Sequence, residues 1–134
     1  MIRLPQAIYD DMINHATDGF PLEVCGILGG TGESVTAIYR MTNTDASHEH
    51  FMMDPREQFA VVKDLRAKGL TMLAIYHSHP ETPARPSEED IKLALTPDIS
   101  YLIVSLVDVA APDVKSYKIN SGNVQLEAIE TIAY

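Results

Sequence analysis

The sequence has one cysteine, few cations and no long apolar run. A single cysteine, Cys25, excludes an intrachain disulfide and a thiolate-rich structural zinc site. Ten Lys and Arg residues against nineteen Asp and Glu residues give a net charge of -9, which would repel a nucleic-acid backbone. The opening MIRLPQAIYDD lacks the apolar stretch of a signal peptide, and no other run is long enough to cross a bilayer. We therefore expect a cytoplasmic protein that binds neither nucleic acid nor membrane.

The remaining composition is that of a globular protein. Apolar residues make up 46% of the 134 residues and charged residues make up 22%. A chain of this length can bury one core, so we expect residues 1–134 to form a single domain.

Residue patterns predict helices and strands in the order α-β-β-β-α-β-α-β-β-β, which favours an α/β fold with a mixed sheet flanked by helices. The predicted helices are 5–18, 54–69 and 87–96, and the predicted strands are 23–30, 34–43, 48–53, 71–79, 100–107, 114–119 and 123–130. The residues that mark the helical spacing are Ile8, Met12 and Ala16 in the first helix, Phe59, Val62 and Leu65 in the second, and Ile91 and Leu95 in the third.

Two histidines close the predicted strand 71–79. His77 and His79 are two residues apart, so their side chains leave the same face of a strand, with Cα atoms about 6.5 Å apart. Their ring nitrogens can therefore converge on one ion. Pro80 cannot continue the ladder of hydrogen bonds, which places the pair at a strand end, where α/β sheets bind ligands.

A Ser-x-x-Asp sequence follows across a proline-rich loop. Ser87 and Asp90 have the spacing of a capping box, in which both side chains would only satisfy backbone amides at a helix start. Asp is shorter than the Glu or Gln that such a box prefers, and its side chain leans toward the helix N-terminus and the strand end. Capping and metal binding can therefore coexist. Two imidazoles and one carboxylate would leave the fourth position of a tetrahedral zinc site to water, as in catalytic sites.

A zinc-activated water also needs a base, and Glu23 is the carboxylate that stands out of place. It lies in the apolar run FPLEVCGIL, where a glutamate is either at a wet strand end or serves a site. Partial burial would raise the pKa of Glu23 and suit it to take a proton from water and pass it on.

These residues resemble the motif of the JAMM (MPN-plus) zinc metallopeptidase family. The family pattern is an upstream Glu, then His-Ser/Thr-His-Pro, six residues, Ser, two residues and Asp. The chain supplies Glu23, the tetrapeptide HSHP, the hexapeptide ETPARP, Ser87 and Asp90, with no departure. The resemblance covers nearly the whole chain, which looks most like the short prokaryotic members. It implies the cytidine-deaminase-like JAMM/MPN fold.

The resemblance also implies a role for each residue of the motif. His77, His79 and Asp90 would bind one Zn²⁺ per chain. Glu23 would act as general acid and base, and Ser87 would help to hold the tetrahedral oxyanion. The implied reaction is hydrolysis of a peptide or isopeptide bond at the Gly-Gly tail of a ubiquitin-like or sulfur-carrier protein.

Other functions stay open at this point. A non-catalytic MPN-fold module would bind a ubiquitin-like partner, although modules of that kind usually lack ligands that are present here. A zinc hydrolase of a small molecule or cell-wall peptide, or a relative of a DNA-repair-associated branch, would carry a similar motif. The acidic charge argues against DNA, and the missing signal argues against the cell wall. The sequence sets neither the physiological substrate nor the oligomeric state, for which a homodimer is one alternative.

Three side chains near the motif residues are not assigned to the chemistry. Cys25 lies two residues after Glu23 and would share its face of a strand, but we interpret it as a small buried hydrophobe rather than a residue lining the site. His48 and His50 repeat the two-apart spacing without a third ligand, so we expect them on a solvated strand face.

Overall fold

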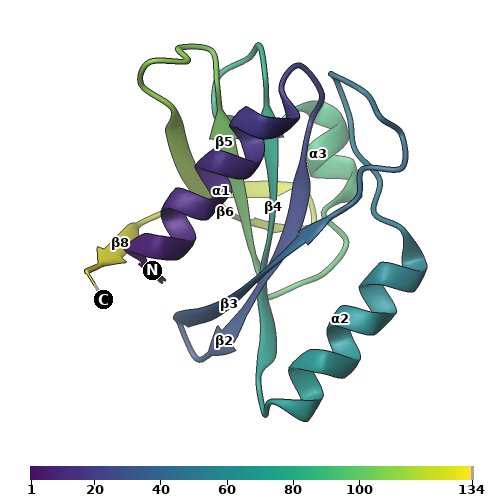
Figure 1. The fold of residues 1–134 in the computed structure, drawn as a ribbon, viewed down its shortest axis with the longest axis vertical. Coiled ribbons are helices and arrows are strands. Elements are labelled where there is room, and N and C mark those ends of the chain that lie inside the picture. Colours follow the sequence, from purple (N-terminus) through teal and green to yellow (C-terminus); the bar gives the residue numbers. More distant parts are fainter. Residues whose placement is uncertain (134) are drawn as a thin grey trace.

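The fold is a curved sheet with a helix on each face and a short third helix at one end (Figure 1). It is a computed structural model that describes residues 1–133. The helices are α1 (Gln6–Gly19), α2 (Pro55–Ala67) and α3 (Glu88–Leu93). The strands are β1 (Ile2–Pro5), β2 (Cys25–Thr31), β3 (Ser34–Met41), β4 (Thr71–His79), β5 (Ser100–Ser105), β6 (Asp113–Asn120), β7 (Asn123–Glu127) and β8 (Ile129–Ile132). None of these helices is long and apolar enough to span a membrane.

The sheet is mixed, as predicted, with the strand order β7-β6-β5-β4-β2-β3-β1-β8. β4 and β5 are parallel at its centre, and β1 is parallel to both β3 and β8. The other neighbouring strands are antiparallel. The two edge strands, β7 and β8, are separated along the chain by Ala128 alone, so the sheet curls until its edges approach each other.

Alternation along β4 divides the core into two sides. Ala74 and Tyr76 pack on the α1 side, where Ile8, Met12 and Ala16 are buried as the helical spacing predicts. Met72 and Ile75 of the same strand face the opposite side, where α2 and α3 lie. All six residues of β5 are buried. The two central strands are therefore covered on both faces, and they carry the site at one end.

The strand prediction needs three corrections. The segment 48–53 is not a strand, because its backbone groups bind the Asn43 side chain, and its one bridge joins Asn43 to Met53. The predicted strand 123–130 is divided at Ala128 into β7 and β8. The short β1 was not predicted, because its main partner is β8, more than one hundred residues away along the chain. Such a pairing leaves no local pattern.

The second and third helices also differ from the prediction. In α2 the buried residues are Val61 and Leu65, whereas Phe59 is 67% exposed and Val62 lies at the surface. The helix therefore contacts the sheet along a narrower stripe than its apolar residues indicate. α3 ends before Leu95, which is 80% exposed.

Candidate metal centre

The carboxyl end of β4 carries the two histidines of the motif. His77 and His79 point to the same side of the sheet, as predicted, and are 3% and 4% exposed. The strand ends at His79, directly before Pro80. The Nδ1 atom of His79 lies 2.9 Å from the carbonyl oxygen of Pro83. This contact orients the ring, because an imidazole nitrogen that donates to a carbonyl leaves the other nitrogen free to bind an ion.

The first turn of α3 delivers the carboxylate. Ser87 Oγ accepts the Asp90 amide at 3.0 Å, and Asp90 Oδ2 accepts the Ser87 amide at 2.9 Å. The predicted capping box is thus confirmed. The same Oδ2 atom lies 3.2 Å from His77 Nε2 and 3.0 Å from His79 Nε2. Capping therefore directs the carboxylate at the histidines.

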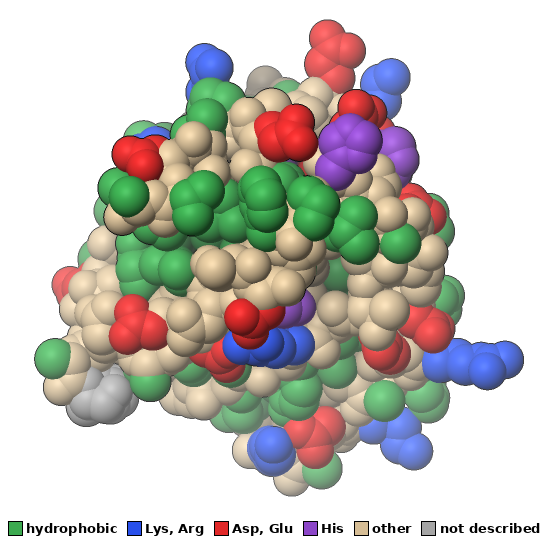
Figure 2. Space-filling model, turned by 45° about the horizontal axis from the view of Figure 1, so that its top comes forward, with side chains coloured by type: hydrophobic (Ala, Val, Ile, Leu, Met, Phe, Trp, Pro, Cys, Tyr) green, Lys and Arg blue, Asp and Glu red, His purple; other side chains and the backbone are tan. Residues whose placement is uncertain are grey.

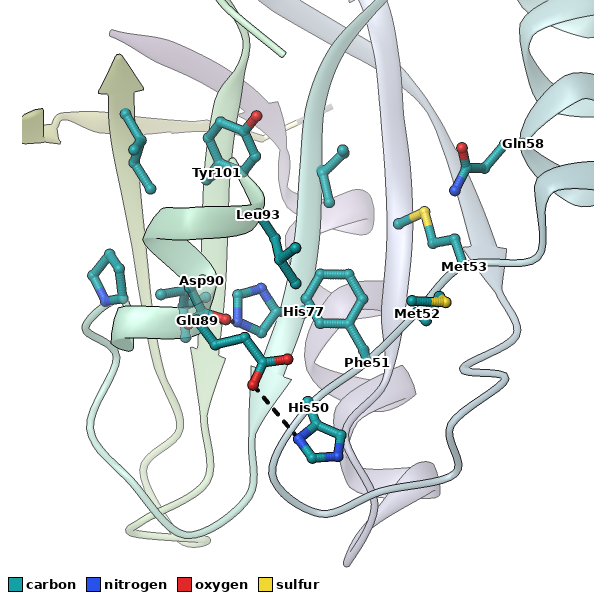
Figure 3. Close-up of a pocket in the computed structure, with 14 residues that line it drawn as sticks. His50, Phe51, Met52, Met53, Gln58, His77, Glu89, Asp90, Leu93 and Tyr101 are labelled. Carbon is teal, nitrogen blue, oxygen red and sulfur yellow. Dashed lines mark hydrogen bonds and ion pairs between the residues drawn. The ribbon is translucent and has the colours of Figure 1, made fainter. Parts of the chain in front are cut away.

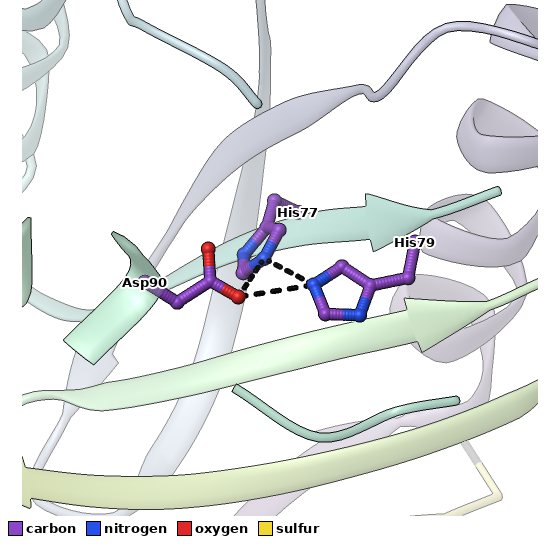
Figure 4. Close-up of side chains that lie close together, drawn as sticks. All are labelled: His77, His79 and Asp90. Atoms are coloured by element: carbon purple, nitrogen blue, oxygen red, sulfur yellow. Dashed lines mark hydrogen bonds and ion pairs between the residues drawn. The ribbon is translucent and has the colours of Figure 1, made fainter. Parts of the chain in front are cut away.

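The three polar atoms form a nearly equilateral triangle (Figure 4). The Nε2 atoms of His77 and His79 are 3.1 Å apart. The other two edges run from these atoms to Asp90 Oδ2 and measure 3.2 Å from His77 and 3.0 Å from His79. A tetrahedral ion with bonds of 2.0–2.1 Å needs ligand atoms about 3.3 Å apart. Within residues 1–133 this is the one group of His, Cys, Asp and Glu close enough to hold a metal. The donor set and its spacing fit zinc, with one position left for water.

The electrostatics of the triangle keep the carboxylate charged. Burial acts to raise the pKa of Asp90, but hydrogen bonds with His77 and His79 outweigh it and hold that pKa well below its usual range. Burial lowers the pKa of His77, which favours the neutral imidazole that binds metals. Burial also acts to lower the pKa of His79, but Asp90 and the Pro83 carbonyl raise it overall.

Glu23 is buried two residues before β2, and its carboxyl group interacts with the charges of His79 and Asp90. It is 5% exposed, and its Oε1 atom is the one fully buried side-chain oxygen or nitrogen of residues 1–133 without a hydrogen-bond partner. Burial raises the pKa of Glu23 to about 8, opposed by the charge of His79 and assisted by that of Asp90. A carboxyl group with this pKa can exchange protons near neutral pH.

The backbone around Glu23 is held by side chains that the sequence analysis missed. Ser78, between the two histidines, is fully buried, and its Oγ accepts the Val24 amide at 2.8 Å. The Ser78 amide in turn donates to the Val24 carbonyl at 3.0 Å. The Asn43 side chain donates to the Glu23 carbonyl at 3.0 Å. Only the position of Ser78 inside the motif signalled its role, and nothing in the sequence signalled that of Asn43.

An apolar cavity of about 260 Å³ opens beside His77 and Asp90. Its walls come from the segment 50–53 on one side and from α3 on the other, with β4, β5 and β6 beneath (Figure 3). Met52 and Leu93 line it although they are 55% and 53% exposed. Apolar side chains gather in a band across one face of the molecule, with histidine side chains near one end of it (Figure 2). The cavity suits an apolar group of an extended ligand.

The side chains that were not assigned to the chemistry are not part of the triangle, although Cys25 is paired with His77 across β2 and β4. Cys25 is fully buried among apolar residues, and burial raises the pKa of its thiol to about 12. His48 and His50 are exposed, as expected, but on a loop rather than a strand. His48 pairs with Glu49, and His50 lies 3.7 Å from Glu89 across the mouth of the cavity.

The sheet and its helices have the fold of JAB1/MPN and JAMM proteins, and relatives named as a peptidase and a desampylase identify the class as JAMM-type hydrolases. Residues 5–120 match the family of prokaryotic homologs of the JAB domain, and the chain belongs to that family. The family resemblance and the fold class inferred from the sequence are thereby confirmed.

Similar proteins include named peptidases. The chain is 34% identical over 123 residues to the CysO-cysteine peptidase of Mycobacterium tuberculosis. The matched region covers 90% of this chain and 84% of that protein. It is also 34% identical over 103 residues to the desampylase of Haloferax volcanii. That match covers 72% of this chain and 74% of the desampylase. The solution structure of protein DSY2949 from Desulfitobacterium hafniense is 46% identical, with a TM-score of 0.91 over 100% of this chain and 94% of that one.

Proposed function

We propose that this chain is a zinc-dependent peptidase or isopeptidase that cuts at the C-terminal Gly-Gly tail of a ubiquitin-like or sulfur-carrier protein. The observation that carries the proposal is the buried Glu23 carboxyl group, which has one unpartnered oxygen and interacts with the charges of His79 and Asp90. A buried carboxyl group without a partner costs stability. Beside three metal-binding atoms, it is the group that hydrolysis by activated water requires.

Each motif residue has a part in this reaction. The zinc would be held by His77, His79 and Asp90. When bound, it would act as a Lewis acid on the scissile carbonyl and lower the pKa of water toward about 7. Glu23 takes the proton that water loses as its oxygen bonds to the carbonyl carbon. The same carboxyl group then gives this proton to the leaving nitrogen as the C–N bond breaks.

Ser87 has a hydroxyl hydrogen left for the substrate. Its Oγ atom accepts the Asp90 amide, and this bond fixes the oxygen beside the first turn of α3. The hydroxyl can then donate to the oxyanion that develops on the scissile carbonyl. Capping and oxyanion stabilisation use different parts of the same hydroxyl group, so one role does not prevent the other.

The shape of the site supports an extended protein tail as the substrate. Glycines have no side chains, so a Gly-Gly segment can approach a buried ion closely. The cavity beside His77 would take an apolar side chain of the same tail. The peptidase activity named for the mycobacterial relative supports the reaction class.

The test combines metal analysis with a cleavage assay. Purified protein should contain one zinc per chain and should release the extension from a ubiquitin-like protein that continues beyond Gly-Gly. A substrate with an isopeptide bond to lysine, run in parallel, separates the two bond types. His77→Ala and Asp90→Ala should lose both zinc and turnover. A folded parent protein without zinc, or full cleavage after chelator treatment, would overturn the proposal.

A pull-down run beside the cleavage assay tests the non-catalytic alternative. A binding module would retain a ubiquitin-like partner in a pull-down after His77→Ala, and it would show no turnover in any form. All the residues for turnover are present here, which favours the hydrolase.

A further inference from the structure

The side chain of Asn43 uses its whole hydrogen-bonding capacity where the chain leaves β3. Its Nδ2 donates to the carbonyl oxygens of Glu23 at 3.0 Å and His50 at 3.1 Å. Its Oδ1 accepts the amides of Asp45 and Met52, both at 3.1 Å. An amide group has two donor hydrogens and two lone pairs, so all four are engaged. The reverse orientation would set its oxygen against two carbonyl oxygens, which fixes the assignment.

These bonds connect the two halves of the candidate site. On one side Asn43 holds the backbone of Glu23, the residue with the unpartnered carboxyl oxygen. On the other side it holds the backbone of the residues before and after Phe51. The Phe51 ring is stacked on His77, with ring centroids 4.6 Å apart and planes inclined by 26° (Figure 3). One amide thus restrains the backbone that carries the Glu23 carboxylate and the backbone that carries the aromatic ring on a candidate zinc ligand.

We propose that Asn43 is a positioning residue that sets Glu23 and the Phe51–His77 stack relative to each other. This inference rests on the proposed function for its catalytic consequence. Proton transfer is sensitive to displacements of about 1 Å, which can cost about 100-fold in rate. Groups that orient metal ligands from behind typically change metal affinity or activity by about 10–100-fold when removed. Asn43 itself touches neither the substrate nor the ion.

Asn43→Asp is the sharpest variant, because it replaces a single heavy atom, the amide nitrogen, by oxygen. It keeps an oxygen to accept the amides of Asp45 and Met52, but it places the second oxygen against the carbonyls of Glu23 and His50. Thr44→Val is the matched control on the same loop. It removes the 3.0 Å bond from Thr44 Oγ1 to the Met52 carbonyl and keeps the 2.9 Å backbone bond to that oxygen.

The first readout is a double-mutant cycle with Glu23→Gln on a cleaved substrate. Asn43→Asp should lower kcat about 10–100-fold with KM within about twofold, whereas Thr44→Val should leave both near the parent values. With zinc at saturating concentration, Asn43→Asp in the Glu23→Gln background should lower kcat by less than about twofold more, because the carboxyl group whose position it sets is gone. An equal effect in both backgrounds would show a general structural role and overturn the inference.

The second readout does not depend on turnover. Zinc affinity, measured by competition with a chromogenic chelator, should fall about 10-fold in Asn43→Asp and stay unchanged in Thr44→Val. Far-UV circular dichroism and thermal unfolding of both variants establish that they are folded. If the parent protein binds zinc but cleaves no substrate, the proposed function is refuted. The zinc-affinity measurement still decides the role of Asn43 in that case. Equal zinc affinity in the parent, Asn43→Asp and Thr44→Val refutes the role of Asn43.

Discussion

Two buried glutamates at opposite ends of the central strands differ in what surrounds their carboxyl groups. Glu23 lies by the end of β4 and has an oxygen without a partner. Glu127 lies by the start of β5, and its side chain is 7% exposed. Its Oε1 atom accepts the hydroxyls of Ser100 at 2.6 Å and Ser116 at 2.7 Å. Glu127 is less buried than Glu23 as a whole residue, but its carboxyl group is enclosed as well, and the two carboxyl groups differ in their partners.

This difference sends the two pKa values in opposite directions. Burial raises the pKa of Glu23 to about 8, since little compensates the loss of water. Burial also acts to raise the pKa of Glu127, but the hydroxyls of Ser100 and Ser116, with the charges of Lys118 and the N-terminal amine, outweigh it and lower that pKa. A buried acid with donors is thus held as a structural anion, whereas a buried acid without them can carry protons. The comparison separates a structural glutamate from a candidate catalytic one without any knowledge of the family.

The largest expected effect is on turnover. Glu23→Gln keeps the size of the side chain but removes the base, so kcat should fall by about 10²–10⁴-fold with zinc content unchanged. Glu127→Gln, the matched control, should keep kcat within about twofold of the parent because it lies at the other end of the sheet. Steady-state cleavage assays on both variants provide the measurement. Equal losses in the two variants would remove the distinction between the glutamates.

The next effect is on the stability of the metal-free protein and has opposite signs for the two residues. The raised pKa of Glu23 means that ionisation disfavours the folded state, with no penalty below about pH 4.5 and the full penalty above about pH 8. Glu23→Gln should therefore stabilise the protein by on the order of 3 kcal/mol at pH 9 and by nothing near pH 4.

Glu127→Gln should do the reverse. The lowered pKa of Glu127 stabilises the folded state above its unfolded pKa, and this contribution disappears as the pH falls through the folded value. The variant should lose about 1 kcal/mol at pH 9 and nothing in acid. Urea unfolding of the parent and both variants at pH 4 and pH 9 checks both signs. If Glu23→Gln were less stable than the parent at pH 9, the prediction would be wrong, and the Glu23 carboxylate would have stabilising partners in solution.

The parts of the site that were predicted from the sequence depend on local geometry. The two-residue spacing of His77 and His79 on a strand, and the three-residue spacing of Ser87 and Asp90 at a helix start, each fix side-chain direction without knowledge of the tertiary fold. Glu23 was found because a carboxylate in an apolar run is unusual.

The parts that were missed depend on contacts between distant residues. Asn43 reaches Glu23 across twenty positions, and Ser78 binds the residue after Glu23 across fifty-four. The segment 48–53 was wrongly predicted as a strand for the same reason, since the Asn43 side chain takes its backbone groups. Phe59 has the apolar character of a core residue yet is exposed, because α2 lies on the sheet along a different stripe.

A smaller effect compares exposed apolar residues at the two ends of the molecule. Met52 is 55% exposed and lines the cavity beside His77, whereas Leu126 is 70% exposed and adjoins Glu127 on β7. Met52→Ser should raise KM for a Gly-Gly tail about 3–10-fold at nearly constant kcat, because roughly 1 kcal/mol of apolar burial with the substrate is lost. Leu126→Ser should change neither constant. A lower kcat in Met52→Ser, or an equal rise of KM in both variants, would contradict binding of the tail in the cavity.

The smallest effect is expected at Cys25, which is as deeply buried as Glu23 and lies two residues away, yet differs from it chemically. Its Sγ atom donates to the Thr42 carbonyl at 3.7 Å, and burial raises the pKa of the thiol to about 12, so almost no thiolate forms near neutral pH. In the folded protein at pH 8, iodoacetamide should leave the thiol unmodified over the time in which it alkylates the urea-unfolded chain, as followed by intact mass.

Cys25→Ala should keep kcat and KM within about twofold and cost about 1 kcal/mol of stability, because only a small apolar volume is lost. If iodoacetamide alkylated the folded protein rapidly and bound zinc prevented this, the thiol would lie in the site. Cys25 would then not be the inert buried residue that its contacts indicate.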